Sequence, residues 1–249
     1  PAAAAVVTRS FFYAPRFSDA RLRLGRWSDY ARFWAVSLAV VALSFAAYTA
    51  LGAVRWDPSG RTFLSQLAEQ MAAAGQNIND LPAGLSPQRM LLIYAVGGLT
   101  VFNVVPGMLT GFGECFGWRD LAFPLLYRVR PWAGFVVGGL LWFAWHLPVA
   151  FVLPQSQAFT PAEQAINLLV LAVGAVCTFT YLAYVYARSG SVFVVSLAHI
   201  VLDNASRSVS YYVVLDNQLL ANLGLTLSSA AVVAILHLRG DLRTLKLSP

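Results

Sequence analysis

Long runs of apolar residues, each close to the length that crosses a lipid bilayer, follow one another along most of this chain. About 20 consecutive helical residues cross the hydrocarbon core, where every backbone polar group must be bonded within the protein. Of the 249 residues, 58% are hydrophobic and only 11% are charged, whereas soluble domains carry about 25% charged residues. The sequence therefore predicts an all-α fold: a polytopic transmembrane helical bundle.

About six crossings are expected, with interfacial helices between them. They lie near residues 31–54, 90–127, 132–153, 162–187, 191–204 and 217–238. The second is too long for one upright helix. Asn103, Pro106 and Gly107 predict a bend within it, because proline cannot donate the helix hydrogen bond.

Two segments outside the crossings have helical patterns of their own. Between the first two crossings, Leu64, Leu67, Met71 and Ala74 share one helical face, which predicts a short interfacial helix. Residues 1–30 form a basic N-terminal arm, in which Ser18 can cap an amphipathic helix lying on an anionic membrane surface. A solvated basic arm is the alternative for that segment.

The basic residues lie mainly in alternate loops. By the positive-inside rule, both termini and the turn at residues 128–131 face the cytoplasm, while residues 57–89 and 154–161 face outward. Arg207 is the one basic residue on the outer side outside those loops. The net charge of +6 is thus explained by topology, and no nucleic-acid partner is expected.

Ionisable residues interrupt three of the apolar runs. Glu114 and Arg119 lie within residues 113–124, His146 lies in the next crossing, and His199 and Asp203 lie in the one beginning near residue 191. Charged groups at membrane depth are costly, which makes them candidates for a functional site. At about 1.5 Å per helical residue, Glu114, His146 and His199 reach depths at which they can meet, closer to the cytoplasmic face.

These residues stand in an order that resembles the CPBP family, the intramembrane proteases related to the CAAX-processing endopeptidase and to bacteriocin-immunity and abortive-infection proteins. That family carries E-E-x-x-x-R, then F-x-x-x-H, then H-x-x-x-N or H-x-x-x-D. The first motif is matched by Glu114, Cys115, Gly117, Trp118 and Arg119, the second by Trp142 and His146, and the third by His199 and Asp203. The resemblance covers residues 90–206, between the first span with its outer loop (31–89) and the last span with its cytoplasmic tail (207–249).

The resemblance implies an intramembrane endopeptidase in a bacterial inner membrane, acting on a peptide or lipidated peptide. Glu114 would be the general base and His146 would help to hold the attacking water. His199 and Asp203 would stabilise the oxyanion, and Cys115, Trp118, Arg119 and Trp142 would support the site. No cofactor is expected, and the sequence does not define an oligomeric state.

Two departures from the family pattern open alternatives. Cys115 stands where the family has its second Glu, so Arg119 needs another partner, for which Asp120 and Asp203 are the candidates. Asp203 replaces the commoner Asn, and an ionised Asp cannot donate to an oxyanion. The chain is therefore also interpretable as a catalytically impaired immunity or scaffold protein. A further alternative is a zinc-dependent hydrolase that uses Glu114, His146, His199 and Asp203 as ligands.

Overall fold

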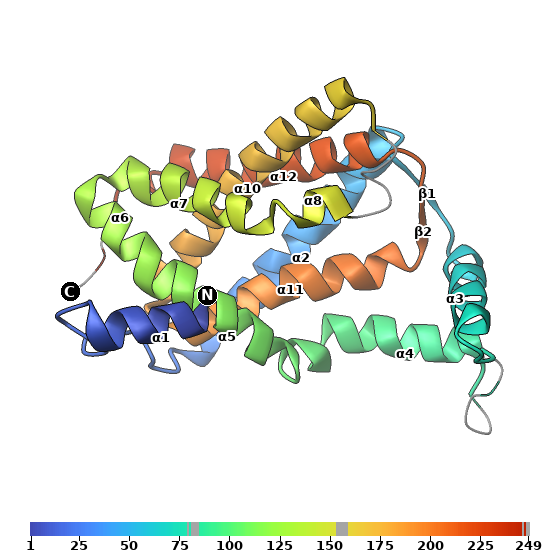
Figure 1. The fold of residues 1–249 in the computed structure, drawn as a ribbon, viewed down its shortest axis with the longest axis horizontal. Helices are drawn as coiled ribbons and strands as arrows, with labels where there is room; N and C mark the ends of the chain where they lie inside the picture. Colours follow the sequence, from blue (N-terminus) through green and yellow to red (C-terminus); the bar gives the residue numbers. More distant parts are fainter. Residues whose placement is uncertain (79, 81–84, 153–158, 246, 248–249) are drawn as a thin grey trace.

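The structure is a computed structural model that describes residues 1–78, 80, 85–152, 159–245 and 247. It is a helical bundle, as the sequence predicts (Figure 1). Four helices are long and apolar enough to cross a membrane: α2 (Trp27–Ala50), α10 (Pro161–Ser189), α11 (Val192–Ser210) and α12 (Gln218–Leu238). α11 packs against α2, while α12 packs against both α10 and α2.

The other two expected crossings are built from shorter helices. The region near residues 90–127 contains α4 (Pro87–Leu99), η1 (Val101–Asn103), α5 (Gly107–Gly117), the π-helical turn η2 (Trp118–Ala122) and α6 (Phe123–Val129). The predicted bend is confirmed, because the chain leaves α4 before η1 and resumes as α5 after Pro106. The next region holds α7 (Pro131–His146) and α8 (Val149–Val152).

A tight turn joins α10 to α11 and brings their ends together. Thr160 and Glu163 form a capping box at the start of α10, and Gly190 ends it with a left-handed φ of 59°. Ser191 then caps α11 by accepting a hydrogen bond from the backbone of Val194. α11 is thereby held against α10 and also packs on α5, which sets up the site described below.

The end of the bundle away from the termini has two features. The predicted helix between the first two crossings is confirmed as α3 (Arg61–Ala73). Sequence reasoning missed a two-stranded antiparallel ribbon of β1 (Val54–Trp56) and β2 (Val213–Leu215), whose strands are too short for a detectable period-2 pattern. The expected outer loop at residues 154–161 falls largely outside the described residues.

The N-terminal arm differs from the prediction of a helix capped by Ser18. No helix begins at Ser18, whose hydroxyl bonds to the Pro15 carbonyl within a turn. The helix is instead α1 (Ala2–Phe11), and it packs along α5. The physical reason is Arg9, which is 1% exposed and pairs with buried Asp120 of η2 at 2.8 Å. A buried ion pair therefore ties the arm to the bundle.

Candidate active site

Three helices bring the ionisable residues together. Glu114 lies in the last turn of α5, His146 is the last residue of α7, and His199 is in the middle of α11. The Glu114 Oε1 and the His146 Nε2 are 3.7 Å apart, and both side chains are partly exposed. The contact between Glu114 and His146 that was predicted from helix depth is therefore present in the structure.

Trp142 lies at the centre of this group. Its indole N–H donates to Glu114 Oε2 at 2.9 Å, and its backbone carbonyl lies 2.9 Å from His146 Nδ1. Its ring is 5.0 Å from the ring of His146 and 5.8 Å from that of His199. One residue, four positions before His146 in the motif, thus orients both the carboxylate and the first imidazole and separates the two histidines.

His199 lies between a buried thiol and an exposed carboxylate. Its Nδ1 is 3.6 Å from the Sγ of Cys115, which is fully buried. Its Nε2 is 3.8 Å from Asp203 Oδ2, whose side chain is 61% exposed. Cys115 therefore occupies the place of the family's second Glu as a direct neighbour of His199.

Arg119 has no carboxylate partner among the residues that the structure describes, so both partners suggested from the sequence are wrong. It is fully buried, and its guanidinium carbon lies 4.6 Å from the ring of Trp142 and 4.9 Å from that of Phe179. None of its three side-chain nitrogens has a hydrogen-bond partner within the part of the chain that the structure describes. Arg119 stabilises Trp142 through a cation–π contact instead of an ion pair.

Asp120 follows Arg119 directly in a π-helical turn, and it does not pair with Arg119 because adjacent residues of a helix do not face each other. The Phe123 N–H bonds to the Trp118 carbonyl, one residue further back than in an α-helix. Arg119 and Asp120 are both buried, but they contact different neighbours. Asp120 accepts hydrogen bonds from Arg9, from the Tyr186 hydroxyl and from the Arg21 backbone N–H.

Trp118 takes no direct part in this arrangement. Its side chain packs against the hydrophobic core, and its indole nitrogen is buried without a hydrogen-bond partner among the described residues. Of the residues expected to support the site, Trp142 contacts Glu114, Cys115 contacts His199, and Arg119 contacts Trp142. Trp118 contributes packing in this conformation.

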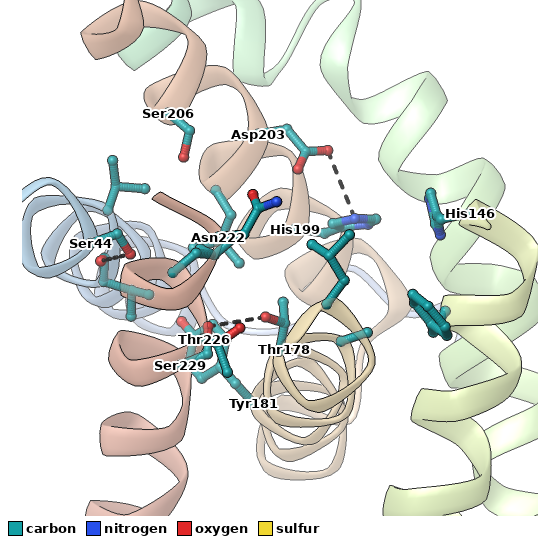
Figure 2. A pocket seen from close by; sticks show the side chains of 18 of the residues that line it. Ser44, His146, Thr178, Tyr181, His199, Asp203, Ser206, Asn222, Thr226 and Ser229 are labelled. Carbon is teal, nitrogen blue, oxygen red and sulfur yellow. Dashed lines mark hydrogen bonds and ion pairs between the residues drawn. The ribbon is translucent and has the colours of Figure 1, made fainter. Parts of the chain in front are cut away.

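A cavity of about 620 Å³ adjoins the site (Figure 2). Its lining includes Glu114, Trp142, His146, His199 and Asp203. Sequence reasoning missed the polar residues that line it from α10 and α12: Asn167, Thr178, Tyr181, Gln218, Asn222, Thr226 and Ser229. Their signal was a row of polar residues at three-, four- and seven-residue spacings on one face of two apolar spans.

The predicted metal ligands form two separate pairs. Glu114 faces His146, and Asp203 faces His199, with the indole of Trp142 between the two imidazoles. Within the part of the chain that the structure describes, no three His, Cys, Asp or Glu side chains are grouped closely enough to hold one metal ion. The arrangement of these donors does not fit the four-ligand zinc site considered from the sequence.

Comparisons with known proteins match the core of the chain to one family. The family model described as type II CAAX prenyl endopeptidase Rce1-like matches residues 96–205. No curated protein and no solved structure matches the chain. The matched segment contains Glu114, His146 and His199 together with Asp203, and it leaves α2 and α12 outside.

Proposed function

We propose that this chain, whose residues 96–205 belong to the Rce1-like family of type II CAAX prenyl endopeptidases, hydrolyses a peptide bond within the membrane. Its membrane bundle and its family support a membrane protease. The observation that carries the finer proposal is the approach of Glu114 to His146, 3.7 Å apart at the edge of a cavity that also holds His199.

The proposed nucleophile is a water molecule held between Glu114 and His146. The Nδ1 of His146 faces the Trp142 carbonyl, which can only accept, so Nδ1 carries a proton. In the neutral ring, Nε2 is then an acceptor that faces the Glu114 carboxylate, which is also an acceptor. A water can donate one proton to each and be deprotonated by Glu114 as it attacks the substrate carbonyl.

The proposed oxyanion donor is His199. If the Cys115 thiol donates to Nδ1 across their 3.6 Å contact, the imidazole tautomer carries its proton on Nε2. That N–H points toward Asp203 in the free protein, and in the proposed reaction it donates to the developing oxyanion. Asp203 then orients the imidazole and does not itself need to donate.

Exchanging Glu114 for Gln tests the proposal. Glu114→Gln keeps an acceptor for the Trp142 N–H but removes the base, and we expect the cleavage rate to fall by about 10²- to 10⁴-fold. The measurement is the set of proteins that accumulate uncleaved in the membrane proteome. Glu69→Gln, on exposed α3, is the matched control. An unchanged proteome in a folded Glu114→Gln protein would favour the immunity or scaffold alternative.

Exchanging Asp203 for Asn separates this mechanism from a metal-dependent one. A metal ligand contributes charge, so Asp203→Asn would lower both metal content and activity in a zinc hydrolase. In the proposed mechanism Asn supplies an extra amide donor near the oxyanion, and activity is kept or raised. The measurement is cleavage as a function of pH together with elemental analysis. Stoichiometric metal that is lost with activity in Asp203→Asn overturns the metal-free mechanism.

A further inference from the structure

The cavity occupies only one half of the bundle. It is lined by residues 40–48 of α2, 167–181 of α10, 199–207 of α11 and 218–232 of α12. The cavity thus adjoins the C-terminal parts of α2 and α11. On α10 and α12 it extends from near the N-terminal end to beyond the middle of each helix. All four segments lead toward β1 and β2, at the right of Figure 1 and away from both termini.

The catalytic residues form the inner wall of this cavity. On α11, His199 is 6% exposed, whereas Asp203 and Arg207, one and two turns closer to β2, are exposed. Toward the other end, Cys115, Phe179 and Leu182 are fully buried beside the site. Packed side chains close the direction toward α1 and α6, so the cavity is the route along which a peptide could reach Glu114 and His199 from the β1–β2 end.

Charge identifies the face at which that path begins. At the end that carries α1 and α6 lie Arg9, Arg16, Arg21, Arg23, Arg26, Arg32, Arg128, Arg130, Arg188, Arg239 and Arg243. At the β1–β2 end the arginines are Arg55, Arg61, Arg89 and Arg207, accompanied by Asp57, Glu69, Asp203 and Asp216. The positive-inside rule assigns the first end to the cytoplasm, so the cavity faces the other side.

Side-chain amides line the outer part of the cavity. Gln218 donates to Asn222 at 2.9 Å, and Asn222 donates to Asn167 at 2.6 Å. The Asn167 side chain is 1% exposed and lines the cavity, and its Nδ2 has no hydrogen-bond partner among the described residues. Figure 2 shows Asn222 in the same cavity as His199 and Asp203. An apolar chain filling this region would leave the Asn167 Nδ2 donor without a partner, whereas a peptide backbone carbonyl can accept from it.

We propose that the cavity binds an unlipidated peptide segment that enters from the extracytoplasmic face, with the amides of Asn167, Gln218 and Asn222 bonding its backbone. This proposal rests on the proposed peptidase function and defines its substrate class. The substrates are then exported or membrane-inserted polypeptides whose cleaved bond is reached from the outer half of the bilayer. A lipid-modified cytoplasmic peptide does not fit this path.

Thiol labelling from one side of the membrane tests the path. Ser206 lines the cavity, Ser65 is exposed on α3, and Ser28 is exposed at the start of α2. Each is exchanged singly for Cys in a Cys177→Ser background, with fully buried Cys115 retained. A membrane-impermeant maleimide is then added to intact cells and to inside-out vesicles. We expect Ser206→Cys and Ser65→Cys to react in intact cells and Ser28→Cys to react only in the vesicles.

The labelling result does not depend on catalysis. The proposal is overturned, even if the protein is a peptidase, if Ser206→Cys is labelled from the same side of the membrane as Ser28→Cys and not from that of Ser65→Cys. If Ser206→Cys reacts in intact cells but Glu114→Gln has no effect on the proteome, the proposed entry path is supported and the proposed peptidase function is contradicted. Asn222→Leu tests the substrate chemistry: we expect KM for a peptide cleaved by the parent to rise by about tenfold, as for the loss of one hydrogen bond. An unchanged KM overturns the role of the amides.

Discussion

The two halves of the bundle on either side of His199 are built differently. Around α1 and α6 the largest fully buried side chains collect, among them Arg9, Phe123, Phe179 and Leu182. Toward β1 and β2 the same long helices diverge around a cavity whose largely apolar lining carries several polar side chains. We infer from this difference that one half holds the proposed site residues in position, while the other half has the cavity in which the proposed substrate would bind. Substitutions in the two halves should therefore differ in whether they change stability or activity.

The largest expected effect on stability is in the packed half. Arg9→Met leaves Asp120 buried without the charge that it pairs with at 2.8 Å, and breaking such a pair costs about 3–5 kcal/mol. The matched change in the other half is Arg55→Met, which breaks a pair with Asp216 in which Arg55 is 72% exposed. We expect little change there, because exposed ion pairs contribute little. Thermal unfolding in detergent measures both, and equal shifts in Tm would contradict the comparison.

Cys115→Glu tests whether the site, where the two halves meet, lacks a negative charge beside Arg119. The fully buried Arg119 guanidinium has no carboxylate acceptor among the described residues, and the groups that act on it electrostatically include Cys115, Glu114 and Asp203. A carboxylate at position 115 should bond to it and stabilise the fold by about 1.5–3 kcal/mol relative to the neutral control Cys115→Gln. A Tm for Cys115→Glu no higher than that of Cys115→Gln would show that the cation–π contacts already satisfy Arg119.

Two alanines on α10 compare the packing of the halves directly. Ala183 is 0% exposed in the core, whereas Ala175 lines the cavity two turns earlier. We expect Ala183→Leu to destabilise the fold by about 1–3 kcal/mol through overpacking. Ala175→Leu should leave Tm unchanged but slow cleavage, because the added side chain fills substrate space. The reverse pattern, with Ala175→Leu the less stable of the two, would mean that the cavity is closed in the working protein.

The sequence predicted the residues of the site better than their partners. Glu114, His146 and His199 could be found because motif spacing and helical rise depend on local sequence. The pairing of Asp120 could not be predicted, because Asp120 does not face its neighbour Arg119 in the helix and pairs with Arg9 instead. Arg9 lies 111 residues from Asp120 along the chain, and no short-range pattern connects them. The bend before α5 was predicted because Pro106 acts on its own turn.

The cavity was missed for a different reason. Asn167 and Asn222 lie on different helices, 55 residues apart, and each resembles an isolated polar interruption of an apolar span. Only the packing of α10 against α12 brings them together. The ribbon of β1 and β2 is another contact between distant segments. Local periodicity therefore predicts helices and motif residues, whereas the choice of partners between helices depends on the tertiary fold.

The smallest expected effect concerns pH at the α1 end of the packed half. Burial by itself would raise the pKa of Asp19, but hydrogen bonds from Tyr13 and Arg9 and the charges of Arg9 and Arg128 outweigh it and lower the pKa below 3.8. Because the pKa is lower in the folded state, Asp19 stabilises the fold above the unfolded pKa. That contribution is lost as the pH falls through the folded pKa. Asp19→Asn should therefore lower Tm at neutral pH and reduce the fall in Tm between about pH 5 and pH 3.

Asp57 is the matched position at the other end of the bundle. Hydrogen bonds from Ser59 and Thr62 lower the pKa of Asp57 to about 2, so its contribution is lost as the pH falls from about 4 through about 2. Asp57→Asn should accordingly alter the Tm profile mainly below about pH 4. Because Asp19 acts through the buried Arg9, whereas Asp57 acts within an exposed turn, Asp19→Asn should also lower Tm more at neutral pH. Identical pH profiles for parent and Asp19→Asn would mean that Arg9 is held by Asp120 alone.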